Sequence, residues 1–220
     1  MEELNCKIMF TIPVGDGLPI YESVVVTWIV MAILVLLSII LVRNLKVENP
    51  GKKQLALEAG YLFFRNFFYN LLGEHGARYI PYMITIVLYI GLANIMGVFG
   101  FVPPTKDMGV TIALALMSII LIEYSGIHQK GTKGWLKSFA EPIPIMLPIN
   151  ILEIGIRPLS LCMRLFGNVL GSYVVMKLVE IICPILLPVP FNLYFDFFDG
   201  FIQAYVFVFL TSLFISEAVE

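Results

Sequence analysis

Arg164 is the residue of this sequence whose chemistry is hardest to explain as packing. It lies in the apolar stretch from Pro158 to Met176, which holds no other charged residue. A guanidinium keeps its proton in proteins, and placing it at bilayer depth costs about 3 kcal/mol or more. Such a group marks either an ion pathway or an internal ion pair. The sequence leaves both open for Arg164, with Asp196, Asp199 and Glu180 as candidate partners.

Small and polar residues share a helical face with Arg164. If the stretch is one helix, spacings of three and four place on this face Ser160, Gly167, Asn168, Gly171 and Ser172. Small residues allow another backbone to approach closely, so whatever packs here passes over a permanent cation. Glu153 and Arg157, four residues apart, are expected to pair near the same face.

A second polar face follows in the last apolar block. Asp196, Asp199 and Gln203 are spaced i, i+3 and i+7 within a segment rich in phenylalanine. Two carboxylates and an amide in such surroundings need water or polar partners, which a hydrated half-pore would supply. Alternatively, the two aspartates cap the start of the helix at the membrane interface, where a carboxylate suits the helix dipole.

Further polar residues are candidates for the same pathway. Tyr173 and Glu180 share a face with Lys177, and Lys177 with Glu180 is expected to form an ion pair near the membrane boundary. Asn94 lies inside an apolar block. Asp107 follows two prolines and is equally explained as an exposed turn residue.

Composition limits the protein class. The chain has 220 residues, of which 59% are hydrophobic and 14% charged, and soluble domains carry about 25% charge. It is therefore an integral membrane protein, and its net charge of −2 argues against a nucleic-acid partner. Cysteines and histidines have no metal-ligand spacing, and no phosphate-binding loop or nucleophile motif is present. We expect no metal, no cofactor and no covalent chemistry.

The hydropathy pattern predicts an all-α membrane protein of about five membrane helices plus one amphipathic helix, forming a single membrane domain over residues 1–220. The expected segments are a first spanning helix at 23–42, an amphipathic segment at 54–79 on the membrane surface or the bundle, a helical hairpin at 81–102 and 109–127, and a second hairpin at 143–181 and 190–216. Pro184 and its neighbours predict the turn of the second hairpin.

The distribution of lysine and arginine predicts the orientation. Basic residues gather at 43–80 and 126–141, while the amino terminus is acidic. By the positive-inside rule the amino terminus lies outside, and five crossings place the carboxyl terminus in the cytoplasm.

Five motifs, in order along the chain, resemble one family: subunit a of the F-type rotary ATP synthase, in its bacterial and chloroplast form. They are ANIMG at 93–97, PPTKDMGVTIALAL at 103–116, LPINILE with RPLSL at 147–161, MRLFGN at 163–168 and FIQAYVF at 201–207.

The resemblance implies a role for each matching residue. Arg164 matches the essential arginine that faces the rotating ring of c subunits. Asn168, Gln203, Glu153 and Asp107 match polar residues of two offset half-channels, through which protons reach and leave the ring. The last two helices are then long, tilted and packed on this ring.

The resemblance also implies the setting of the chain. It would be a stator subunit without enzymatic activity of its own, in the cell inner (plasma) membrane. Its partners would be the c-subunit ring, peripheral-stalk b subunits, other ATP synthase subunits and lipid.

One position departs from the family pattern. Nine residues beyond the arginine most members carry a glutamate, and here this position is Tyr173. We hypothesise that Asp196, Asp199 or Glu180 supplies the carboxylate of the access channel. The ion, proton or sodium, stays open.

Two other classes fit less well. A secondary transporter also needs polar residues in broken helices, but it usually shows internal repeats, and none is evident in the sequence. A structural scaffold has no need for Arg164 at such a cost.

Overall fold

The structure, a computed structural model of the chain, describes residues 8–12, 18–43, 45–46, 51–99, 101–139, 147–182 and 188–219. Within them, five helical stretches are long and apolar enough to cross a membrane, which confirms the predicted all-α membrane fold. Two short antiparallel strands, β1 (Ile8–Ile12) and β2 (Leu18–Tyr21), precede the helices and were not predicted.

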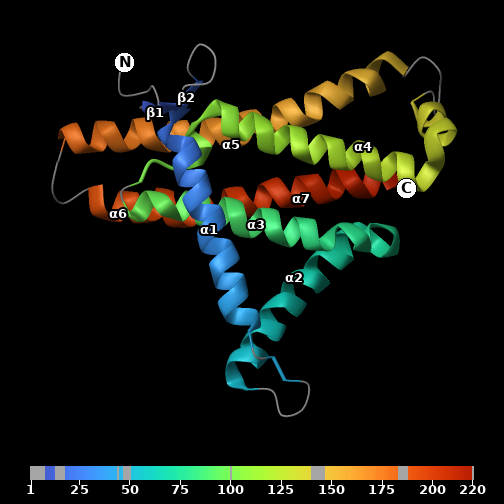
Figure 1. The fold of residues 1–220 in the computed structure, drawn as a ribbon. Coiled ribbons are helices and arrows are strands. Elements are labelled where there is room, and N and C mark those ends of the chain that lie inside the picture. The colour runs from blue at the N-terminus through green and yellow to red at the C-terminus, as the bar shows by residue number, and fades with distance from the viewer. Residues whose placement is uncertain are drawn as a thin grey trace.

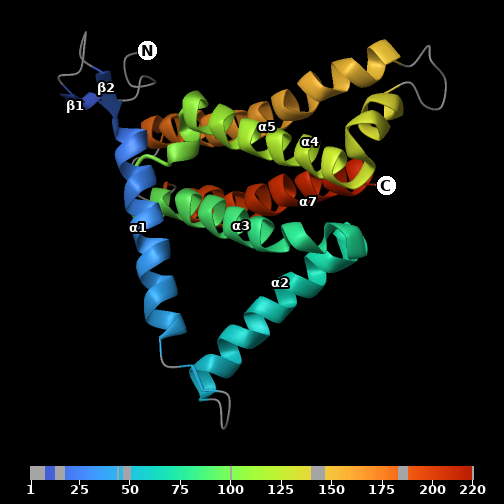
Figure 2. The ribbon, with the colours of Figure 1, turned by 45° about the vertical axis from the view of Figure 1, so that its right-hand side comes forward.

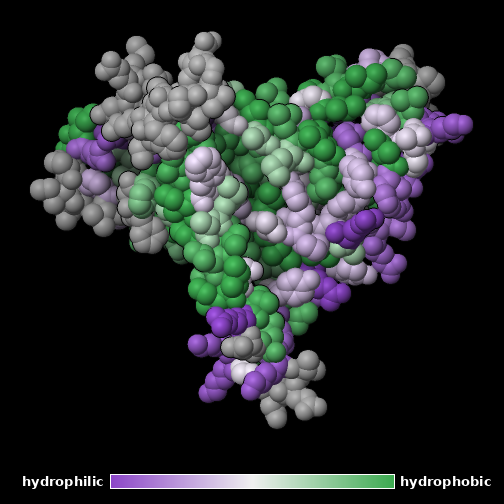
Figure 3. Space-filling view, viewed as in Figure 1, coloured by the Kyte–Doolittle hydropathy of each residue, from purple (hydrophilic) through white to green (hydrophobic). Residues whose placement is uncertain are grey.

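Helix α1 (Glu22–Val42) packs on α3 through its first turns and crosses the direction of the other long helices in both ribbon views (Figures 1 and 2). It buries only Ser23, Val26 and Val30, which lie at i, i+3 and i+7 in its first turns. Its other aliphatic side chains are largely exposed, as suits contact with lipid. Figure 3 shows hydrophobic atoms along this flank and hydrophilic ones gathered at its foot.

Helix α2 (Lys52–Gly76) runs obliquely from the foot of α1 to the other helices (Figure 2). Only its last turns are buried, through Phe68 and Leu72, and the Phe67 ring lies 5.6 Å from that of Tyr205. The amphipathic segment therefore packs on the bundle at its carboxyl-terminal end. A short 3-10 turn, η2 (Ala77–Tyr79), leads into the next helix.

Four helices lie side by side in both ribbon views: α3 (Ile80–Ile95), α4 (Met108–Ser138), α5 (Leu147–Ile182) and α7 (Gly200–Val219). Each contributes side chains to one apolar core, including Met83, Ile90, Ile122, Leu165, Phe207 and Ile215. Two short turns, η3 (Met96–Phe99) and η4 (Pro104–Lys106), join α3 to α4.

Helix α4 runs past the end expected from hydropathy, at residue 127. It continues to Ser138 through Gly131, whose φ of 71° is accessible to glycine at little cost. The break turns the last residues back, so that the Trp135 indole N–H donates to the Glu123 carboxylate at 2.9 Å. The extension was missed because its residues are polar and make tertiary contacts that hydropathy does not record.

Helix α5 is continuous through Pro158, and Pro148 lies in its first turn, where proline is tolerated. The turn expected near Pro184 lies outside the described residues. The chain resumes as α6 (Pro188–Asn192), a π-helical stretch η6 (Leu193–Asp199) and α7.

Candidate functional site

Arg164 lies near the middle of α5 with its side chain exposed. The opposite face of the helix, with Leu161, Cys162 and Leu165, is buried against the bundle. Among the described residues no hydrogen bond or ion pair reaches the Arg164 guanidinium. The helix thus presents a cation outward from an apolar anchoring face.

Two of the three acids considered as ion-pair partners of Arg164 contact other side chains instead. Glu180 bonds Lys177 at 3.0 Å, the expected i, i+3 pair. Asp199 accepts from side chains other than Arg164, as the next contacts show. The side chain of Asp196 lies outside the described part of the structure. An internal ion pair of Arg164 with Asp199 or Glu180 is therefore not formed.

A polar network joins α5 to the start of α7, one turn beyond Arg164. The Asn168 side-chain amide donates to Asp199 at 3.0 Å and to the Gln203 carbonyl oxygen at 3.2 Å. The Ser172 hydroxyl lies 3.4 Å from the second oxygen of Asp199. The two polar faces that periodicity separates in the sequence thus meet, and Asp199 contacts α5.

Gln203 is only 4% exposed, and its Nε2 has no hydrogen-bond partner within the described residues. A buried amide without a partner costs about 1–3 kcal/mol. Its N–H groups are thus available to water or to an acceptor brought by a partner.

Asn94 connects α3 to the start of α7. Its amide donates to the Gly200 carbonyl oxygen at 3.1 Å, and its own carbonyl accepts from Thr105 at 2.7 Å. A Cβ at Gly200 would lie 2.8 Å from that of Asn94, so the close approach needs glycine. Asn94 is a packing residue that lines the cavity described next.

A first cavity of about 240 Å³ lies beside this network. Its lining includes Asp199, Gln203, Ser172, Tyr173 and Glu180. Lys106 also lines it, is 7% exposed, and holds its ammonium 3.4 Å from the centre of the Tyr173 ring. Position 173, at which the family pattern has a glutamate, thus carries a tyrosine whose ring contacts the Lys106 ammonium.

Lys106 was not among the residues singled out from the sequence. Its place between a proline-threonine turn and Asp107 was the signal that could have drawn attention to it. Asp107 accepts from the Gly109 backbone N–H at 2.9 Å and from the Ser23 hydroxyl, which makes it the N-cap of α4. It does not line the first cavity.

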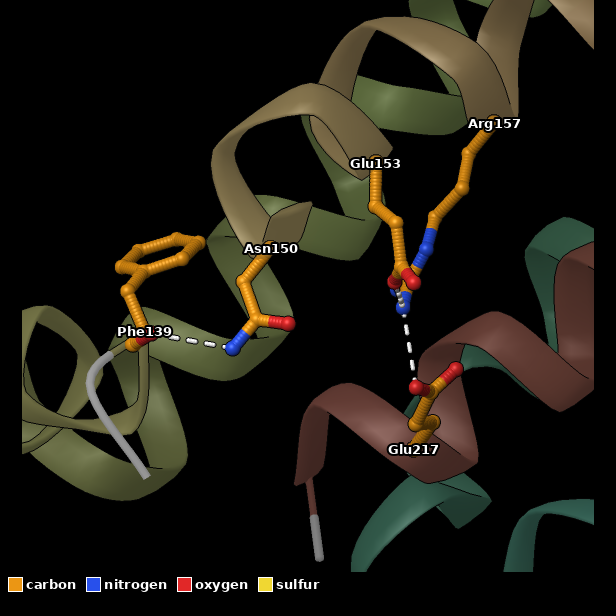
Figure 4. A network of polar contacts seen from close by, with 5 residues as sticks. All are labelled: Phe139, Asn150, Glu153, Arg157 and Glu217. Atoms are coloured by element: carbon orange, nitrogen blue, oxygen red, sulfur yellow. Dashed lines mark hydrogen bonds and ion pairs between the residues drawn. The ribbon is translucent and has the colours of Figure 1, made fainter. Parts of the chain in front are cut away.

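A second cavity of about 270 Å³ lies between the ends of α4, α5 and α7. Figure 4 shows its central contacts: the Arg157 guanidinium bonds Glu153 at 2.8 Å, as expected, and Glu217 of α7 at 2.9 Å. At the same end, the Asn150 amide donates to the Phe139 carbonyl oxygen at 2.9 Å. Glu217 was missed because its partner is distant in sequence.

Arg164 separates the two cavities along α5. Arg157 is the last α5 residue in the lining of the second cavity, and Val169 is the first α5 residue in the lining of the first cavity. They are twelve residues apart, or about 18 Å of helix at 1.5 Å per residue, and Arg164 lies between them. The two cavities are therefore offset on either side of an exposed cation.

Within the described residues no group of histidine, cysteine, aspartate and glutamate is placed to hold a metal ion. Cys162 is buried and free, as expected for a small apolar residue. Cys6 and Cys183 lie outside the described ranges.

Comparison with known proteins shows the family of the chain. The family model described as "ATP synthase A chain" matches residues 24–216. The chain is 37% identical over 204 residues to the ATP synthase subunit a of Moorella thermoacetica, covering 92% of this chain and 93% of that protein. It is 31% identical over 245 aligned residues to the "ATP synthase subunit a, sodium ion specific" of Propionigenium modestum, covering 97% and 84%. The chain therefore belongs to the ATP synthase subunit a family, whose members are multi-pass membrane proteins that assemble with other ATP synthase subunits.

Proposed function

We propose that this chain is the ion-conducting stator subunit of the ATP synthase membrane sector and has no enzymatic activity of its own. The observation that carries the proposal is the exposed Arg164 between two offset cavities. The first cavity borders Lys106, in a loop that the charge pattern places outside; the second borders Trp135 and Ser138, in a segment expected inside. We assign the cavities as the two half-channels that serve a rotating ring of c subunits.

The mechanism is electrostatic. A ring carboxylate must be neutral where it faces lipid and charged where it exchanges its proton with water. Arg164 favours the ionised form as each ring site passes, which releases the proton into one half-channel. The same fixed charge blocks ions from moving directly between the half-channels. Each charge that crosses 100 mV supplies about 2.3 kcal/mol, so several must cross per ATP.

The ring-facing surface is proposed to consist of α5 with η6 and α7. Both parts expose large apolar side chains, among them Met163, Val174, Leu178, Phe197 and Phe201. A Cβ at Gly167 or Gly171 would meet no atom within 4 Å beyond its own stretch of helix in the described part of the chain, which leaves room for a ring helix.

We further propose the location and remaining partners of the chain. Other partners are the peripheral-stalk b subunits and lipid. The location is the cell inner (plasma) membrane, with the amino terminus outside and the carboxyl terminus cytoplasmic.

Protons are the proposed coupling ion, and sodium is the second candidate because of the Propionigenium relative's name. Acidification of inverted vesicles that is independent of sodium supports protons. Acidification that occurs only as a secondary response to sodium movement identifies sodium.

The access carboxylate is tested by amide replacement. We expect Asp196→Asn, Asp199→Asn and Glu180→Gln together to lower ATP-driven proton pumping about fivefold or more, because each amide keeps the shape and loses the exchangeable proton. Pumping is measured as quenching of a pH-sensitive dye in inverted vesicles. Undiminished pumping by the triple variant excludes all three residues as the access group.

The two half-channels are tested by labelling from opposite sides of the membrane. In a chain whose native cysteines are replaced by serine, Met176→Cys lies in the first cavity and Ile154→Cys in the second. A membrane-impermeant maleimide should label position 176 only from outside and position 154 only from the cytoplasmic side. Labelling of both positions from the same side contradicts the assignment.

A further inference from the structure

Arg157 links two helices at the wall of the second cavity. Its side chain is 17% exposed, and the same guanidinium nitrogen, Nη2, bonds both Glu153 and Glu217. The guanidinium also lies 5.1 Å from the ring of Phe214, one turn before Glu217 on α7. Figure 4 shows the Glu217 carboxylate reaching from α7 toward Arg157 on α5.

The two acids restrain Arg157 in different ways. Glu153 lies four residues before Arg157 on the same helix, so this bond orients the side chain without joining helices. Glu217 lies 60 residues away on α7. Only the second bond connects α5 to α7.

This connection occurs where α5 is weakened. Pro158 follows Arg157, and a proline inside a helix removes one backbone hydrogen bond and crowds the preceding turn. The amino-terminal part of α5 therefore depends on tertiary contacts to keep its direction. Apolar packing tolerates small rotations, whereas a paired charge specifies one register.

Arg164 lies between two such connections. Seven residues, or about 10 Å of helix, separate it from Arg157. Four residues in the other direction, Asn168 bonds Asp199 and Gln203. The α5 segment that carries Arg164 is thus attached to η6 and α7 on both sides by directional contacts.

We propose that Arg157 is a positioning residue: through Glu217 it holds the register of α5 on α7, and so holds Arg164 between the two half-channels. The inference rests on the proposed function. The proposed role of Arg157 is separate from ion exchange. The contact between α5 and α7 requires a cation on one helix that faces an acid on the other, and not a particular residue at either place.

The test uses Glu217→Gln and the exchanged pair Arg157→Glu with Glu217→Arg, in the complete ATP synthase in inverted vesicles. Glu217→Gln should lower the ratio of proton pumping to ATP hydrolysis about tenfold, with the amount of complex unchanged. A catalytic group misplaced by about 1 Å costs up to about 100-fold, and the amide keeps one acceptor for Arg157, so a smaller loss is expected. The exchanged pair should recover at least half of the wild-type ratio. Glu58→Gln is the control, since Glu58 is exposed on α2 and bonds Gln54 of the same helix.

Three results overturn the proposal. They are a wild-type ratio in Glu217→Gln, failure of the exchanged pair to recover that ratio although the complex is assembled, and a fall in pumping only in proportion to the amount of complex. The last result identifies a folding contact. Arg164→Ala in the same vesicles tests the proposed function separately, because its loss of pumping does not depend on Arg157.

Discussion

Replacing Arg164 by alanine is expected to abolish ATP-driven proton pumping, lowering it about 100-fold or more, while the soluble head continues to hydrolyse ATP. An opposite charge within a few ångströms shifts a carboxyl group by about 1–3 pKa units, and removing it removes the force that ionises each ring carboxylate. The side chain is exposed and takes part in no hydrogen bond or ion pair among the described residues, so we expect its loss to leave the fold intact. The measurement is dye quenching in inverted vesicles beside the ATPase rate.

Arg164→Lys refines this prediction. Lysine keeps the charge but loses the planar, five-donor fork, so coupled transport is still expected to be lost. Arg65→Ala is the control, because Arg65 is an exposed arginine on α2, remote in sequence from both cavities. Normal ATP synthesis in Arg164→Lys, or acidification by Arg164→Ala equal to wild type, would remove the central claim.

The second large effect is expected from Gly171→Leu, with Gly167→Leu as a companion. Each glycine is exposed on α5 and a Cβ meets nothing within 4 Å, so leucine is accommodated by this chain. Glycine costs a helix about 1 kcal/mol relative to good helix formers, so either substitution should keep or raise thermal stability in detergent. If a ring helix packs here, the larger side chain blocks its passage, and pumping should fall about 20-fold or more.

Gly60→Leu provides the matched control. Gly60 is also exposed and has no atom within 4 Å of a Cβ, but it lies on α2. It should retain pumping. Wild-type pumping by Gly171→Leu would show that the ring does not approach this face of α5.

The local contacts of the site were predictable from the sequence. Glu153 with Arg157 and Lys177 with Glu180 are pairs within one helix, and their spacing places the charges on the same face whatever the surroundings. The membrane class and the isolation of Arg164 likewise follow from composition, because a charge in a long apolar stretch is visible in the chain itself.

The contact between the polar face of α5 and that of η6 and α7 was only partly predictable. Periodicity put Asn168 on one face and Asp199 with Gln203 on another, but it does not say that these faces pack together. For Asp107 the sequence left a turn residue and a pathway residue equally open. The structure makes it the N-cap of α4, which is a contact with an adjacent backbone N–H.

The contacts that only the tertiary structure decided join distant parts of the chain: Lys106 over Tyr173, Glu217 with Arg157, and Trp135 turned back to Glu123. Each depends on how one helix is rotated and shifted against another, or on a reversal at a single glycine. The sequence determined which faces are apolar and which charges are isolated, because these are properties of one helix. Register between helices results from packing the whole bundle at once, and that packing placed an exposed Arg164 between two cavities.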